Sequence, residues 1–68
     1  MKELAPHQQR VVAERAELST RIDALEVFIF PSHPVFSTLD ERQQSLLTQQ
    51  LDAMKAYEHI LGLRISYF

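Results

Sequence analysis

The sequence predicts an all-α fold, an antiparallel two-helix hairpin that assembles into a helical oligomer. Two segments carry apolar residues at helical spacing, and the stretch between them contains Pro31 and Pro34. Proline lacks a backbone N–H and pushes the preceding residue out of the helical region, so one continuous helix cannot pass through this stretch. We therefore expect helices over about residues 6–30 and 39–62 or beyond, in a single domain that spans residues 1–68.

Size and charge limit the possible functions. The chain has 68 residues, a net charge of −2 and no cysteine, so it has neither disulfides nor thiolate metal sites. A core this small contributes about 3–5 kcal/mol, and we expect a homo-oligomer to bury more apolar surface. The chain has no basic block and no apolar run of roughly 18 residues, which argues against duplex nucleic acid or a membrane as partners. No signal peptide is evident at the start, so we expect a cytoplasmic protein.

The first helix should begin near Pro6, because proline is tolerated in the first turn, where its N–H would have no partner. The apolar positions of this helix repeat every seven residues, with two more beside them: Leu4, Val11, Leu18, Leu25, Ile22 and Ile29. This stripe is typical of a helix that packs along one face.

The second helix should begin between residues 38 and 41, because Asp40 with Gln43 and Thr38 with Glu41 each have the form of a capping box. Its apolar face is broad and contains Leu46, Leu47, Leu51, Ala53, Met54, Tyr57, Ile60, Leu61 and Ile65. One facing helix cannot cover this width, so we expect more than two helices to meet. After Gly62 the pattern fits either a continued helix, which we favour, or a short strand.

An antiparallel arrangement can be tested by its register, because each step along one helix is a step back along the other. One register places apolar residues opposite each other throughout, in the pairs Leu25 with Leu47, Ile22 with Leu51, Leu18 with Met54, and Val11 with Leu61. The same register places Arg15 opposite Glu58. These two residues interrupt the apolar stripes of the first and second helix, and we predict that they form an ion pair. The pair either fixes the register or holds Arg15 ready for an anionic ligand.

Cationic and aromatic side chains are interleaved near the end of the second helix. The candidate ligand-binding residues there are Lys55, Tyr57, His59, Arg64 and Tyr67, with Arg15 as a further candidate. Such side chains can stack a base and bind a phosphate. In the alternative interpretation the tyrosines are core or interface aromatics and the cations are solubilising. Phe28, Phe30 and Phe36 near the turn either close the end of the hairpin or bind a partner.

No pattern predicts catalysis, a metal site or a cofactor. His7, His33 and His59 lack the spacing of a metal site. One glycine cannot build a glycine-rich phosphate loop, and no nucleophile elbow or paired-acid motif is present. We therefore expect the chain not to be an enzyme.

Residues 46–57 read Leu-Leu-x-x-Gln-Leu-x-Ala-Met-x-x-Tyr, which is more than a generic amphipathic pattern. Further positions that carry the same resemblance are Gln9-Arg10-Val11-Val12, Glu14, Leu18, Ile22, Leu25, Phe28-Ile29, Phe36, Leu39, Gln43, Leu61 and Arg64-Ile65. Over about residues 8–66 the chain resembles the small phage-encoded helical-hairpin proteins first catalogued in crAss-like phages. The two prolines of the turn depart from the more polar, acidic linker of that family. The resemblance implies a phage origin, a small oligomeric helical protein, and the cytoplasm of an infected bacterial host.

A looser analogy, at the level of the fold, links the chain to other small phage hairpin proteins that sequester the nucleotide messengers of bacterial immunity in the CBASS and Thoeris systems. It suggests an anti-defence sponge that binds a cyclic oligonucleotide or a cyclic ADP-ribose type of second messenger between subunits, without catalysis. The competing hypothesis is a module that inhibits a host protein through an apolar helix face or the Phe30–Phe36 turn. A purely structural oligomerisation piece is the third.

Overall fold

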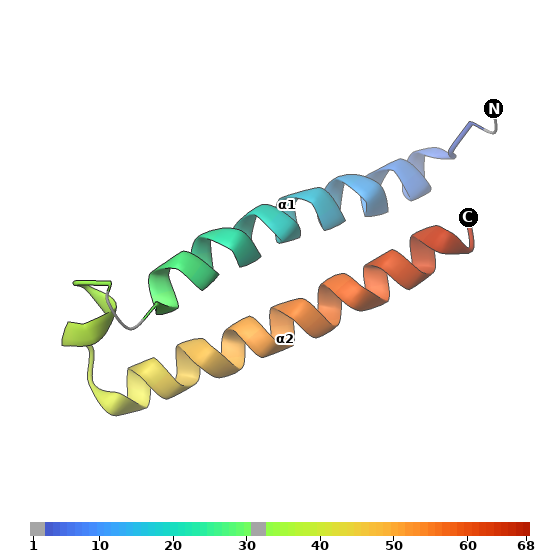
Figure 1. Ribbon diagram of the computed structural model, residues 1–68. Coiled ribbons are helices and arrows are strands. Elements are labelled where there is room, and N and C mark those ends of the chain that lie inside the picture. Colours follow the sequence, from blue (N-terminus) through green and yellow to red (C-terminus); the bar gives the residue numbers. More distant parts are fainter. Residues whose placement is uncertain (1–2, 31–32) are drawn as a thin grey trace.

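The computed structural model is a hairpin of two long helices, and it describes residues 3–30 and 33–68. Helix α1 spans Pro6–Ile29, the short 3-10 helix η1 spans Phe36–Thr38, and α2 spans Glu41–Ser66. The two long helices run antiparallel, with the turn at one end and the start of α1 beside the end of α2 at the other (Figure 1). The predicted all-α hairpin is confirmed, and its assembly into an oligomer stays a prediction.

Helix α1 begins at Pro6, as the sequence predicts. Two glutamines satisfy backbone groups ahead of the helix: the Ala5 N–H donates to Gln8 Oε1 at 2.9 Å, and Gln9 Nε2 donates to the Leu4 carbonyl at 2.8 Å. The helix ends at Ile29, one residue earlier than expected. Pro31, one of the two prolines predicted to break the helix, lies outside the described residues.

The turn end of the hairpin is closed by aromatic side chains. The Phe28 ring lies 4.9 Å from the His33 ring and 5.9 Å from the Phe36 ring, measured between centroids. Phe36 is buried, whereas Phe30 is 64% exposed. Phe28 and Phe36 therefore close the hairpin end, and Phe36 offers no surface to a partner in the single hairpin.

Helix α2 begins after Asp40, which is its N-cap. The Gln43 N–H donates to Asp40 Oδ1 at 2.7 Å and so satisfies one of the free amides of the first turn. Thr38, the other predicted cap, lies in η1 instead and donates its hydroxyl to the Val35 carbonyl. The helix continues through Gly62 to Ser66, so the continued helix is confirmed and the alternative of a strand over residues 63–68 is wrong.

The core is a narrow row along the seam between the two helices. Its buried members are Leu18, Ile22, Leu51 and Leu61, with Val11, Leu25, Ile29 and Met54 packed against them. Both members of three predicted pairs lie in this cluster, which agrees with the predicted register. Leu47, the expected partner of Leu25, is half-buried and lies outside it. Leu61 is fully buried.

Much of the apolar surface lies outside this core. Large apolar side chains that are more than a third exposed are Val12, Val27, Phe30, Val35, Leu46, Tyr57, Ile60, Leu63 and Tyr67. The broad apolar face of α2 is thus only partly covered by α1, and the expectation that further helices cover it stays a prediction. Within the described residues, neither helix combines the length and apolarity needed to cross a membrane.

Candidate functional site

A groove with a volume of about 380 Å³ runs along one edge of the seam between α1 and α2. Its lining residues come from both helices and are Val12, Arg15, Ala16, Ser19, Glu58 and Ile65. The α1 members recur at three- to four-residue intervals, which places them on one side of that helix. Two of the lining residues, Ala16 and Ser19, have small side chains. We name this side of the hairpin the groove edge.

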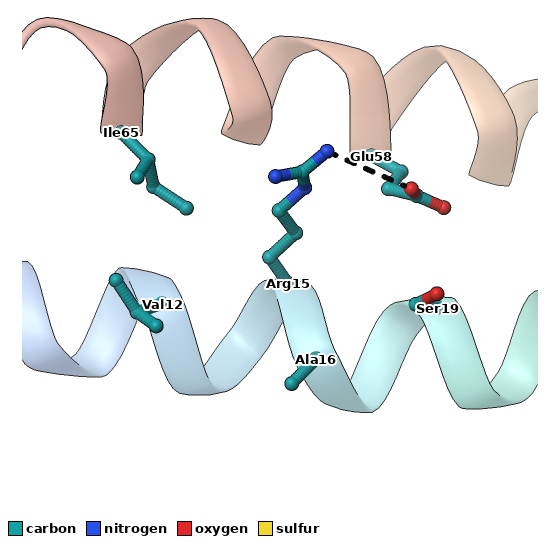
Figure 2. Close-up of a pocket in the computed structure, with 6 residues that line it drawn as sticks. All are labelled: Val12, Arg15, Ala16, Ser19, Glu58 and Ile65. Atoms are coloured by element: carbon teal, nitrogen blue, oxygen red, sulfur yellow. Dashed lines mark ion pairs between the residues drawn. The ribbon is translucent and has the colours of Figure 1, made fainter.

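Arg15 spans the groove edge. Figure 2 shows its side chain reaching from α1 across the seam to α2, between Ile65 and Glu58. The distance from Arg15 Nη2 to Glu58 Oε1 is 4.0 Å, and the two side chains are 44% and 29% exposed. The predicted ion pair is confirmed.

The contact between Arg15 and Glu58 is electrostatic rather than a hydrogen bond, because 4.0 Å exceeds hydrogen-bond distance. No described residue accepts a hydrogen bond from the Arg15 guanidinium, which carries five N–H donors. A half-exposed cation with free donors beside a groove is suited to bind an anion.

The opposite edge of the seam carries Tyr57 and Arg64, which lie seven residues apart and so on one side of α2. We name it the tyrosine edge. Across from them lies Glu14 of α1, whose hydrogen-bonding contact is the main cause that raises the pKa of Tyr57 above its usual 10.0. Partial loss of hydration and the negative charge of Glu14 add to the effect, while the charge of Arg64 opposes it. The Tyr57 hydroxyl therefore stays protonated at neutral pH.

Lys55, another predicted ligand residue, lies on the groove edge but nearer the turn. Its Nζ is 3.8 Å from Glu26 Oε1, and both side chains are about half exposed. Lys55 precedes Glu58 by three residues, which puts the two on one side of α2. The Lys55 cation therefore lies beside Glu26 of α1 on the groove edge.

His59 and Tyr67 complete the predicted set. His59 is exposed, and successive helical residues are about 100° apart, so it points away from the direction of Tyr57. Tyr67 lies just past α2 and is 88% exposed, with its N–H donating to the Arg64 carbonyl at 3.2 Å.

The six predicted residues thus do not form one cluster within a single hairpin. Arg15 and Lys55 lie on the groove edge, whereas Tyr57 and Arg64 lie on the tyrosine edge. The reason is that residues two apart in a helix point in divergent directions, even when they are close in sequence. Their role in binding a ligand stays a prediction.

Several residues of the two edges were absent from the predicted set. Ala16 and Ser19 line the groove, and no sequence pattern marks them. Glu14 could have been found, because the predicted register places it nearly opposite Tyr57. Among the described residues, no group of three His, Asp or Glu side chains could hold a metal ion.

Of three comparisons with known proteins, one finds a match. Neither the curated proteins nor the solved structures contain a match to the chain. The model of the Sequestin family matches residues 5–67, which include both helices and the turn between them. The chain therefore belongs to the Sequestin family.

Proposed function

We propose that this chain is a sponge, a homo-oligomer of hairpins that binds a nucleotide messenger between subunits and holds it without catalysis. The observation that carries the proposal is Arg15, a cation with free donors beside a groove of about 380 Å³. Small-ligand sites have volumes of about 300–1,000 Å³, so the groove can hold part of a nucleotide. The name of the family, Sequestin, fits a protein that sequesters its ligand.

The groove of one hairpin is open and needs a second hairpin to enclose a ligand. Leu46, Ile60 and Tyr57 leave about half of their surface exposed on the tyrosine edge. If this edge of a second copy covers the groove, it buries these apolar side chains and adds Tyr57 and Arg64 to the site. The two groups of predicted ligand residues then meet between subunits, although a single hairpin separates them.

The expected ligand is a nucleotide with phosphodiester or pyrophosphate groups. Arg15 would bind a phosphate oxygen pair through its planar guanidinium, and Tyr57 would stack a base. Lys55, His59, Arg64 and Tyr67 would supply further charge and stacking at the rim. Cyclic oligonucleotides and cyclic ADP-ribose isomers have this combination of groups. Together with the resemblance to phage hairpin proteins, this chemistry suggests an anti-defence role in an infected bacterium.

Native mass spectrometry tests the proposal directly. The purified protein is measured with and without a panel of cyclic di- and trinucleotides and cyclic ADP-ribose isomers. We expect an oligomer that gains the mass of one of these compounds, loses it in Arg15→Gln, and keeps it in Arg42→Gln. Arg42 is a suitable control because it is an exposed arginine at the turn end of α2. An oligomer that binds no compound of the panel would overturn the messenger assignment.

A second candidate is supported by the exposed apolar residues near the turn. Val27, Phe30 and Val35 are each more than half exposed, and such a patch can bind a protein partner. In this reading the chain inhibits a host protein through the turn, with Phe30 but not the buried Phe36 as the contact.

The two candidates differ in the state of Phe30 in the oligomer. Fluorine NMR of protein labelled with fluorophenylalanine, assigned with Phe30→Leu, reports whether the ring is in contact with solvent. An exposed ring in an oligomer that binds no nucleotide favours the protein-interaction module. A ring covered by other subunits removes the support for that candidate.

A further inference from the structure

Gly62 is the one glycine of the chain, and it lies inside α2, where glycine is among the least favourable residues. Its φ is not positive, so the backbone conformation does not require glycine. The close neighbour of Gly62 is a side chain from the other helix. A Cβ at position 62 would lie 3.0 Å from Nη2 and 3.1 Å from Cζ of Arg15. These distances are well below the optimal separation of about 3.5–4.0 Å, so the missing side chain provides the space in which the guanidinium lies.

Glu58 and Gly62 act on the same guanidinium. They are four residues apart, one above the other on α2, and Arg15 meets both. The guanidinium lies next to where a Cβ at position 62 would be, while the Glu58 carboxylate attracts it from 4.0 Å without a hydrogen bond. Arg15 is thereby positioned, but its N–H donors are left free.

We propose that this arrangement is an exchangeable anion receptor, in which Gly62 positions Arg15 and Glu58 is a resident counter-ion that a phosphate or pyrophosphate group displaces. The inference rests on the proposed function for the natural ligand, and it adds the means by which the site takes and selects that ligand. A planar guanidinium binds two phosphate oxygens at once, and such hydrogen bonds are shorter and stronger than the contact with Glu58. The exchange is therefore favourable for a phosphate group.

The geometry distinguishes a receptor from a pair that only fixes the register. A pair that fixes the register is favoured by short, bidentate hydrogen bonds, and a wrong register costs most when it leaves one buried partner unpaired. The Arg15 side chain is 44% exposed and its contact with Glu58 is 4.0 Å long. Both features weaken the ion pair and leave the cation open to a competing anion.

The test uses inorganic pyrophosphate as the probe. The intact protein, labelled with nitrogen-15, is titrated while the Arg15 Nε–H signal is followed by NMR, with Arg15→Gln to assign it. Sodium chloride at matched ionic strength controls for screening. We expect a saturable shift of the Arg15 signal with pyrophosphate and none with sodium chloride.

Two variants test the roles of Glu58 and Gly62. Glu58→Gln removes the competing carboxylate, and we expect pyrophosphate to bind about two- to fivefold more tightly, the range that exposed ion pairs imply. Gly62→Ala displaces the guanidinium, and we expect binding weaker by about three- to tenfold. Its thermal midpoint should not fall, because alanine favours the helix, so weaker binding would not reflect unfolding.

Thr48→Ala is the matched control for Gly62→Ala. It also raises the helix propensity of α2, but Thr48 is exposed and lies far from Arg15 along the helix. We expect wild-type binding in this variant. If Gly62→Ala binds pyrophosphate as the wild type does, or if Glu58→Gln binds no more tightly, the receptor is overturned.

The outcomes separate this inference from the proposed function. Pyrophosphate exchange at Arg15, in a protein that binds no member of the nucleotide panel, would support the receptor and overturn the messenger sponge. If a nucleotide binds without shifting the Arg15 signal, and binds Glu58→Gln and Gly62→Ala as tightly as the wild type, the receptor is overturned and the sponge is supported.

Discussion

The two edges of the seam between α1 and α2 differ in what fills them. On the groove edge, the Arg15 side chain extends toward α2 between Ile65 and Glu58, in the groove that Ala16 and Ser19 also line. On the tyrosine edge, Tyr57 and Arg64 occupy the space beside Glu14. Both edges flank the same row of buried residues. One core therefore lies between an edge with a groove and an edge with an exposed tyrosine.

This difference teaches how a two-helix protein can build a site that it cannot enclose. A hairpin has one packed seam, and each edge of the seam faces solvent. A second copy whose tyrosine edge covered the groove edge would bring Arg15 and Tyr57 into one site. Heterologous contacts of this kind close into rings or extend into filaments, depending on the rotation between copies.

The largest expected effect comes from breaking the core that both edges share. Leu61→Ala removes the most deeply buried side chain, and such changes cost about 2–5 kcal/mol. Because a core of this size contributes about 3–5 kcal/mol, we expect most of the free energy of unfolding to be lost. Urea denaturation followed by circular dichroism measures the loss.

Leu63→Ala is the control for this prediction, since it removes the same side chain from a position that is 45% exposed. We expect a cost below about 1 kcal/mol, as for a surface substitution. Equal losses in the two variants would contradict the core described above and would place Leu63 in an interface between copies.

A smaller effect should separate the two ion pairs of the groove edge. Double-mutant cycles with glutamine at Arg15 and Glu58 should give a coupling energy of about 0.2–1 kcal/mol, as for other solvent-accessible pairs. Lys55 and Glu26 should couple less, because their side chains are more exposed, at 51% and 48% against 44% and 29%. Both couplings should shrink at high salt. A larger coupling energy for Lys55 with Glu26 would show that the exposure of the side chains does not determine the strength of these two ion pairs.

The elements of the fold could be predicted because they depend on local patterns. Apolar spacing gives the two helices, the Asp40 side chain gives the start of α2, and the register gives the pair of Arg15 with Glu58. Each follows from residues that are neighbours along a helix or that face each other in a simple antiparallel arrangement.

The candidate site could be predicted only in part. The groove is lined by residues of both helices, including Ala16 and Ser19, and small residues on a helix surface usually carry no signal of such a role. The sequence alone indicates that Gly62 weakens the helix. The reason for a glycine at this position is seen only in the structure, where the Arg15 guanidinium lies next to it. The separation of Lys55 from Tyr57 likewise needs the rotation of α2 about its axis, which the pattern of a broad apolar face does not fix.

The smallest expected effect concerns the tyrosine edge and appears only at high pH. The contact with Glu14 raises the pKa of Tyr57 above 10.0 in the folded chain, so the folded state holds this proton more tightly than the unfolded state does. The stabilisation is therefore fully present below pH 10.0 and is lost as the pH rises through the folded pKa. Absorbance titration of the phenolate in a Tyr67→Phe background measures this pKa for Tyr57 alone.

Two variants give the sign of each neighbour's contribution in this titration. Glu14→Gln should lower the pKa of Tyr57, because it removes the carboxylate that accepts the tyrosine hydrogen bond and, with it, the negative charge that disfavours the phenolate. Arg64→Gln should raise it, because the arginine stabilises the phenolate. If neither variant moves the titration, Tyr57 does not lie between these two charges. Opposite shifts would show that α1 and α2 meet on this edge as described, because Glu14 reaches Tyr57 only across the seam.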